Sequence, residues 1–566
     1  MEGKGMEENK KYYNLSNPQK SIWLTEQHYI NTNVGNIVGI LDFKENINIE
    51  LLKEAVNLVV EKNEALRTGF IFLDGELKQF IKDFESFNID ILEMQNPIEY
   101  IKEFSNIQFD MEKDMLFHFE IIKLNNNTIK LISRFHHIIT DAWSLSLIIS
   151  EIVEIYTKLQ NKTDMIDKYY GYSNYIEDEK KYIVSDKYFK DQSYWNEIYD
   201  TEPQILNFKK IENKNIANAK RFEYVLEQKI SDKIKTYCKE NNISTYCFFL
   251  TCLQLYISKG FNIEDVIIGN PFLNRKNHKE RQSIGMYVNT LPIRLKTDYE
   301  KSIKELLKEN NTIIRNTLKH EQYPYNDILE YVKDKYNINQ NLYNVLFSYQ
   351  NAQDNRKDTK LKYSTQWVFN NNISDNLEMH IHDRDDNGTF NIVYDYQENV
   401  FTNNQIDKLN KRYSNIINQL LSGKKHLVKD IEIISKEEKN KILDIYNDTY
   451  LNFSKERQLK SVYNVILNNN KHKSNNIALE ENESKITYKE LFERVNKLAN
   501  LLKEKFGIKE NENIGIITDK SIDTIIRNTC NIKNKLYCSS NRSELSDYKK
   551  RIYDIKCRNK NNTIHK

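Results

Sequence analysis

Apolar residues recur at helical spacing in several stretches of the chain. The spacing predicts helices over seven ranges: 51–62, 144–159, 230–240, 245–258, 302–320, 488–506 and 520–528. Ser144 is the predicted N-cap of the second of these helices. Runs rich in β-branched and aromatic residues predict a hairpin over 117–124 and 128–139. Similar short runs predict strands over 265–268, 343–349, 390–396 and 513–518. Together these elements indicate a mixed α/β fold.

Composition excludes several classes of protein. The chain has 566 residues, and 83 Lys+Arg against 81 Asp+Glu give a formal net charge of +2. Such a balance gives no general attraction to nucleic acid or to an anionic membrane. Six cysteines without a CxxC spacing predict neither a disulfide framework nor a structural zinc site. We find no signal peptide and no apolar run near 18 residues, so we expect a cytoplasmic protein without a membrane partner.

Glycine and proline placement indicates where the organisation of the chain changes. All six prolines lie within the first 324 residues, and only Gly507 and Gly515 follow Gly423. The range 435–453 is polar and helical without strong periodicity, which is typical of a junction between domains. The range 541–566 carries eight Lys/Arg against three Asp/Glu without apolar periodicity, and we expect a poorly ordered tail there.

The adjacent pair His136-His137 is the main candidate for chemistry. It ends a predicted strand, so the two side chains should lie on opposite faces and at most one should act directly as an acid or base. An imidazole beside an amine can orient it and accept its proton. Asp141 lies at the following turn, where it could pair with an arginine or cap the next helix. On spacing alone, a buried structural histidine pair with a capping aspartate explains the pattern better than catalysis.

Other residues in the sequence give weaker evidence of a catalytic or metal site. No GxSxG nucleophile motif lies near the histidine pair. His380 and His382 are the only other close histidines, and we interpret them mainly as surface residues. A zinc site needs three or four ligands, so we predict no metal.

Eight short motifs, in order, resemble those of the condensation domains of nonribosomal peptide synthetases. The most specific is 136–144, which resembles HHxxxDGxS. The others resemble AQ-x-R-x-W, HExLRTxF, Y-x-D-Y, IGxPxxxR, IGxFVNT, HQxYPF and FSYQN, at 15–23, 63–70, 172–175, 268–275, 284–290, 320–325 and 345–351. This resemblance implies two lobes like chloramphenicol acetyltransferase, arranged as a V with a central tunnel.

The resemblance also implies the roles of individual residues. His137 would face the tunnel and position or deprotonate the attacking amine, and Asp141 would pair with Arg275. The implied catalytic set is His136, His137 and Asp141. Arg67 and Arg275 would support it, and the implied tunnel or substrate positions are Ala142, Trp143, Ser144 and Asn289. For Asn289, structural packing is a better explanation than direct catalysis. For Trp143, packing and contact with the acceptor substrate explain the residue equally well. Ala142 replaces the glycine of the motif, which would be unfavourable if that position required positive φ.

The range 486–491 is similar to the L-T-Y-x-E-L motif that opens adenylation domains. After Ile525 the similarity decays, and the glycine-rich phosphate loop is absent from the sequence. The resemblance implies a truncated adenylation domain that does not adenylate. We therefore expect a first lobe at 1–180, a second lobe at 181–435, a linker at 436–460, an incomplete α/β adenylation fragment at 461–540 and a basic tail at 541–566.

The implied reaction forms an amide between an acyl thioester donor and an aminoacyl group held on a peptidyl-carrier protein. The thiol arm is CoA or the phosphopantetheine of a partner carrier protein, and we expect no bound cofactor, no nucleic acid and a monomer. The ranges 18–26, 320–326 and 380–384 are similar to starter domains that load a fatty acyl group, although an elongation domain fed by a separate protein remains open. Two alternatives are an idle carrier-docking remnant and a free-standing CoA-dependent acyltransferase.

Overall fold

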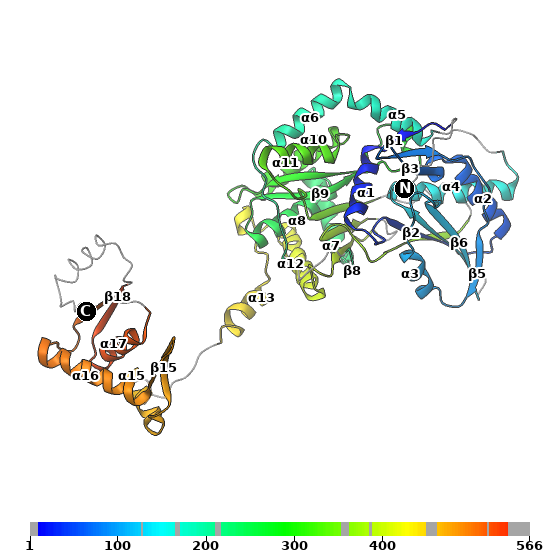
Figure 1. Ribbon diagram of the computed structural model, residues 1–566. Helices are drawn as coiled ribbons and strands as arrows, with labels where there is room; N and C mark the ends of the chain where they lie inside the picture. Colours follow the sequence, from blue (N-terminus) through cyan, green and yellow to red (C-terminus); the bar gives the residue numbers. More distant parts are fainter. Residues whose placement is uncertain are drawn as a thin grey trace. The chain divides into compact units, whose positions relative to one another are not determined.

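A computed structural model describes residues 10–125, 128–164, 170–209, 217–351, 361–383, 388–448, 461–517 and 520–541. The chain divides into two compact units, residues 1–439 and 440–566 (Figure 1). Most of the predicted basic tail and the end of the predicted linker, 449–460, lie outside the described residues. No helix in the described part of the chain is long and apolar enough to cross a membrane.

The first lobe of unit 1 is built on a five-stranded sheet with the order β12-β2-β7-β6-β5. Its strands are β2 (Asn36–Phe43), β5 (Asp90–Met94), β6 (Phe117–Leu124), β7 (Ile129–His136) and β12 (Tyr363–Val368). The predicted hairpin is confirmed, because β6 and β7 pair antiparallel. A small sheet accompanies it: β1 (Tyr13–Asn14), β3 (Thr68–Leu73) and β4 (Glu76–Ile81).

Helices cover both faces of this sheet. The lobe contains α1 (Asn17–His28), α2 (Ile49–Lys62), η1 (Glu64–Arg67), α3 (Ile98–Asn106), α4 (Ala142–Asn161) and α5 (Tyr172–Ile183). Leu131 shares a buried cluster with residues of α2 and α4, whereas the next residue, Ile132, joins Phe104 of α3 in a separate cluster. The two-residue strand period explains this division, because successive side chains point to opposite faces.

Strand β12 shows a limit of the predicted lobe boundaries. It lies within 181–435 but pairs antiparallel with β2 of the first lobe, Thr365 opposite Leu41. An uncovered β2 would leave a row of backbone groups unpaired at the sheet edge. Two strands so far apart in the sequence carry no local pattern that predicts their pairing. Lobe boundaries drawn as continuous residue ranges therefore could not include it.

The second lobe has a six-stranded sheet with the order β10-β9-β11-β13-β14-β8. Its strands are β8 (Ala219–Val225), β9 (Asp265–Phe272), β10 (Asn289–Lys296), β11 (Val345–Gln350), β13 (Leu377–His382) and β14 (Asn391–Gln397). Its helices are α6 (Asp186–Ile198), α7 (Gln228–Glu240), α8 (Thr245–Phe261), α9 (His278–Arg281), α10 (Ile303–Lys319), α11 (Tyr325–Tyr336) and α12 (Asn403–Ser422), with η2 at Val428–Asp430.

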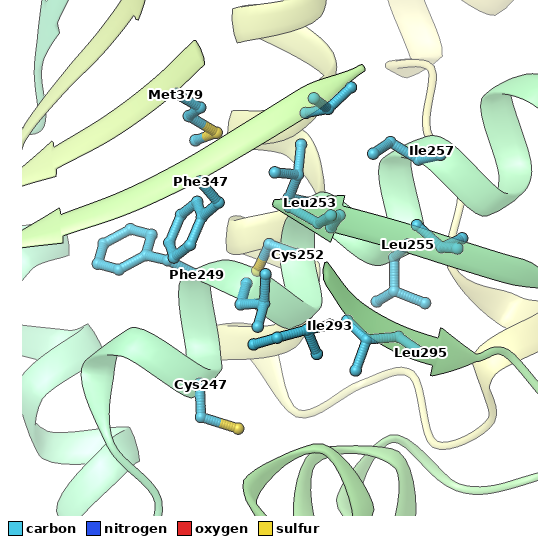
Figure 2. Packing of buried hydrophobic residues seen from close by; sticks show 14 of the residues in the cluster. Cys247, Phe249, Cys252, Leu253, Leu255, Ile257, Ile293, Leu295, Phe347 and Met379 are labelled. Atoms are coloured by element: carbon cyan, nitrogen blue, oxygen red, sulfur yellow. The ribbon is translucent and has the colours of Figure 1, made fainter. Parts of the chain in front are cut away.

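Helix α8 forms the centre of this lobe. It is buried on every side, which is typical of a helix surrounded by other elements. Figure 2 shows Phe249, Cys252 and Leu253 of α8 beside Phe347 of β11 and Met379 of β13. The core therefore lies between the sheet and the helices that pack against α8, chiefly α10 and α12.

The second unit has a smaller core of its own. Helix α13 (Lys436–Asn440) and a π-helical turn (Lys441–Ile445) lie at the division of the chain. The unit contains α15 (Val462–Asn469), η4 (Lys471–Lys473), β15 (Ile477–Glu481), β16 (Ser484–Thr487), α16 (Tyr488–Phe506), β17 (Asn513–Ile517), α17 (Ile522–Lys533) and β18 (Tyr537–Asn541). The predicted helix over 488–506 is confirmed, and a capping box between Thr487 and Glu490 fixes its start.

Replacing Leu253 by alanine should destabilise unit 1 by about 2–5 kcal/mol, because it removes a fully buried side chain and leaves a cavity. All four tryptophans lie before residue 440, so tryptophan fluorescence during urea unfolding reports on unit 1 alone. Leu318→Ala is the matched control, because Leu318 is exposed on the neighbouring helix α10. Equal losses in the two variants would contradict the central position of α8.

Candidate active site

Two histidines at the end of β7 have different surroundings. His136 is the last residue of β7 and is buried, whereas His137 begins the turn before α4 and is half-buried. The predicted strand ended later, at 139, so the two-residue period does not extend to His137, and the difference in burial follows from its place in the turn. The backbone N–H of His137 donates to the carbonyl of Gly35 at 2.7 Å. This bond ties the turn to the residue that precedes β2.

The surroundings of His137 favour the neutral form of its imidazole. Burial lowers the pKa of His137 and outweighs the opposing effect of the Asp141 charge. Its Nδ1 atom is buried, and no described residue supplies a hydrogen-bond partner for it. A neutral imidazole has one nitrogen that accepts a proton. The turn therefore presents a proton acceptor on a backbone fixed by the Gly35 bond.

Asp141 connects the two lobes. Its Oδ2 atom accepts from Nη1 of Arg275 at 2.8 Å and from the backbone N–H of Tyr287 at 3.0 Å. Its Oδ1 atom accepts from the backbone N–H of Ser144 at 2.7 Å, so Asp141 caps α4. Burial alone would raise the pKa of Asp141, but the Arg275 charge and these hydrogen bonds hold it below its ordinary value. Both proposed roles, arginine pairing and helix capping, are therefore present together.

Ser144 takes part in the contact between the two lobes. It does not cap α4, which corrects the prediction that Ser144 is the N-cap of this helix. Its hydroxyl donates to the carbonyl of Gly285 and accepts from Nη2 of Arg275, both at 2.7 Å. Nε1 of Trp143 donates to the carbonyl of Arg281 at 2.9 Å. Ser144 is fully buried, so it holds the lobes together and is not placed to contact a substrate.

The remaining candidates lie in other surroundings. Ala142 is exposed and begins α4 without positive φ, so replacing the motif glycine causes no backbone strain. Asn289 is buried and donates to the carbonyls of Glu321 and Tyr323, which supports the packing interpretation. Arg67 donates to the carbonyl of Lys82 beside the small sheet. The structure thus brings together the histidine turn, Asp141, Ser144 and Arg275, and gives Asn289 and Arg67 separate contacts.

Sequence reasoning missed Glu26. Its Oε1 atom lies 2.6 Å from Nε2 of His136, although the two residues are far apart in the sequence. A single carboxylate on an amphipathic helix has no local feature that marks it as a histidine partner. Only the packing of α1 against the end of β7 brings them together.

His380 is not a surface residue, which corrects the second histidine prediction. Its side chain is 13% exposed, and Nε2 lies 3.4 Å from Oδ2 of Asp395 and 3.5 Å from Oε2 of Glu378. Burial alone would lower its pKa, but these two carboxylates raise it to about 9. The Glu378, His380 and Asp395 donors lie within 4.8 Å of one another. Arg221 already binds both oxygens of Asp395 at 2.8 Å, so the group is better suited to an ion-pair network than to a divalent cation.

Replacing Asp141 by asparagine should destabilise unit 1 by about 3–5 kcal/mol, because Arg275 becomes an unpaired buried charge. The loss should be present above the ordinary carboxyl pKa of 3.8 and should shrink as the pH falls through the lowered folded-state value. Urea unfolding followed by tryptophan fluorescence measures it. Asp110→Asn, in an exposed pair with Lys113, is the control and should leave the midpoint unchanged.

His380 should make stability pH-dependent. Its folded-state pKa of about 9 exceeds the ordinary value of 6.5, so its contribution is complete below pH 6.5 and is lost as the pH rises through 9. The full effect is at most about 3 kcal/mol, from 1.36 kcal/mol per pKa unit. His380→Gln should flatten the decline in unfolding free energy between pH 6.5 and 9. An unchanged decline in this variant would show that another group causes it.

Comparison with known proteins agrees with this geometry. The family profile described as Condensation domain matches residues 9–443. Surfactin synthase subunit 1 of Bacillus subtilis (strain 168) is 25% identical over 522 residues, which is 90% of this chain and 14% of that protein. Bacitracin synthase 3 of Bacillus licheniformis is 25% identical over 528 residues, which is 92% of this chain and 8% of that protein. The chain thus spans less than a fifth of the length of these relatives.

Solved structures show the same fold. The starter condensation domain of rhizomide synthetase, in complex with C8-CoA, matches with a TM-score of 0.65 and 18% identity, over 75% of this chain and 98% of that one. A four-domain nonribosomal peptide synthetase bound to AMP and glycine matches with a TM-score of 0.73 and 14% identity, over 96% of this chain and 42% of that one. Because the family profile covers well over half of the sequence, the chain belongs to the condensation-domain family of nonribosomal peptide synthetases.

Proposed function

We propose that this chain forms an amide bond between an acyl thioester donor and the amine of an aminoacyl group on a carrier protein. The observation that carries the proposal is the neutral, half-buried imidazole of His137 on a turn fixed to Gly35. The clamp between Asp141 and Arg275 gives this turn a fixed position relative to the second lobe. Family membership supplies the reaction class, and the site supplies the group that handles the proton.

In the proposed mechanism, the amine nitrogen attacks the thioester carbonyl carbon while His137 accepts a proton from the amine. The tetrahedral intermediate then collapses, the carbon–sulfur bond breaks, and the proton passes from His137 to the departing thiolate. The products are an amide and a free thiol, so atoms and charge balance. Aminolysis of a thioester is already favourable, and the protein contributes mainly by alignment of the two substrates. Proton transfer by a positioned histidine adds to this.

We favour a starter role, with a fatty acyl-CoA as donor, and an acyl group on a carrier protein is the donor of the elongation alternative. Two observations support it: the ranges 18–26 and 320–326 resemble starter domains, and the rhizomide starter domain that shares this fold was solved with C8-CoA. The phosphopantetheine arm of a partner carrier protein, or CoA, enters as part of the substrate. We further propose that Asp141, Arg275 and Ser144 act by holding the lobes, and that His136 acts by supporting His137.

We also propose that residues 461–540 are the beginning of an adenylation domain. Helix α16 begins directly within the motif at 486–491, and the unit continues as β17, α17 and the parallel strand β18. Curated synthetases align with 90% or more of the chain, beyond the end of the condensation profile. Residues 461–540 contain no glycine-rich phosphate loop, so we propose that this range by itself does not activate an amino acid.

The direct test is a mass-spectrometric condensation assay with the full chain, several acyl-CoAs, an acyl carrier protein and a panel of aminoacyl carrier proteins. His137→Ala should lower the rate by at least about a hundredfold, because a positioned acid–base group contributes that much or more. His472→Ala is the control, since His472 is exposed in the second unit.

The donor decides the subtype. Transfer from acyl-CoA establishes a starter domain, and transfer from the acyl carrier protein alone establishes an elongation domain. A folded protein that transfers from neither donor overturns the proposed activity and favours a carrier-docking remnant. Full activity in His137→Ala overturns the role of this histidine.

A further inference from the structure

Glu26 takes no part in the proposed proton transfer, yet it contacts the histidine pair. It lies on α1 near the C-terminal end of the helix, and its Oε1 atom is 2.6 Å from Nε2 of His136. The His136 side chain is 3% exposed and the Glu26 side chain 21%. A carboxylate partly removed from water is stabilised by a polar or cationic neighbour, and the His136 ring lies at that distance.

The hydrogen bonds at His136 assign its tautomer. The backbone N–H of Ile138 donates to Nδ1 at 3.1 Å, so Nδ1 is the ring nitrogen without a proton. By elimination Nε2 is the ring nitrogen that carries the proton. Oε1 of Glu26 lies within ion-pair distance of it, at 2.6 Å. The Phe109 ring packs edge-on against the imidazole with centroids 6.1 Å apart. Both nitrogens and one side of the ring are therefore occupied.

These contacts reach His137 from two directions. Ile138, whose N–H binds His136, is the next residue after His137. Gly35, whose carbonyl accepts the His137 N–H, lies directly against Glu26. A Cβ at position 35 would overlap Oε1 of Glu26 and would lie 3.1 Å from Nε2 of His136. The backbone of the histidine turn is thus fixed on both sides by groups that contact the Glu26–His136 pair.

We propose that Glu26 is a positioning residue for condensation. Its carboxylate favours the proton on Nε2 of His136, the tautomer that the Ile138 N–H also selects, and it holds the ring in place. This ring, through the Ile138 N–H and the Gly35 contact, sets the place of the His137 imidazole. The kinetic part of this inference rests on the proposed function, whereas the tautomer part does not. Glu26 acts through another residue, so its loss should lower kcat and leave KM nearly unchanged. A small displacement of a catalytic group is enough for a large loss of rate.

Three variants of the full chain test the proposal. Glu26→Gln keeps an oxygen that accepts from Nε2 but removes the charge, whereas Glu26→Ala removes the acceptor. Gly35→Ala leaves the carboxylate in the sequence but pushes it away from His136, and Gly35 has no positive φ that an alanine would strain. Gln27→Ala, an exposed change on the same helix, controls for effects on α1 itself.

Two readouts separate positioning from general stability. Nitrogen-15 NMR of histidine-labelled protein, with the His136 signals assigned by loss in His136→Gln, reports which ring nitrogen carries the proton. Steady-state condensation kinetics report kcat and KM. We expect Glu26→Ala and Gly35→Ala to lower the population of the Nε2–H tautomer measurably and to lose about tenfold or more in kcat. We expect Glu26→Gln to retain the tautomer and most of kcat, and Gln27→Ala to match the unchanged protein.

Each outcome decides the proposal. An unchanged His136 tautomer in both Glu26→Ala and Gly35→Ala overturns it, whatever the activity. A changed tautomer with unchanged kcat overturns the positioning role. If the unchanged protein forms no amide with any donor, the proposed function fails, and the tautomer measurement still decides whether Glu26 controls His136. A loss confined to KM would place Glu26 in substrate binding and would overturn positioning.

Discussion

The buried ion pair between Asp141 and Arg275 is the constraint on which the arrangement of the site depends. Both side chains are fully removed from water, so neither charge is tolerable without the other. Asp141 belongs to the first lobe, at the start of α4, and Arg275 follows β9 of the second lobe. The same carboxylate accepts backbone N–H groups from both lobes, at Ser144 and Tyr287. One residue thus caps a helix, joins two lobes and fixes the end of the histidine turn.

The histidine turn is held by this clamp at one end. At the other end it is held by the hydrogen bond to Gly35, just before β2, and by the contact of Glu26 of α1 with His136. His137 has a buried ring nitrogen, Nδ1, for which no described residue supplies a partner. A buried group without a partner costs free energy, and sites of chemistry are where such a cost is retained. The Glu26–His136 pair provides the opposite condition, because both nitrogens of that ring are engaged. The adjacent histidines therefore differ in what surrounds them and not in their intrinsic chemistry.

A second network of charges stabilises the sheet of the second lobe. Arg221, Asp395 and Glu378 lie opposite one another on three neighbouring strands, and His380 completes the group. A protonated His380 reduces the excess of negative charge there, which is why its pKa is raised. This network and the Asp141 clamp respond to pH in opposite senses. The first weakens as the pH rises through 9, and the second weakens when the pH falls far enough to protonate Asp141.

The sequence by itself determined part of the secondary structure, the ordered motifs and the place of the histidine turn, because periodicity, caps and short motifs are local properties. Helix α16 and the β6–β7 hairpin follow from such patterns. Tertiary structure alone decided which distant groups meet: β12 beside β2, Glu26 against His136, and His380 among carboxylates. It also decided that Asp141, and not Ser144, caps α4. These contacts depend on how elements pack in three dimensions, and a partner far away along the chain leaves no mark in the residues next to it.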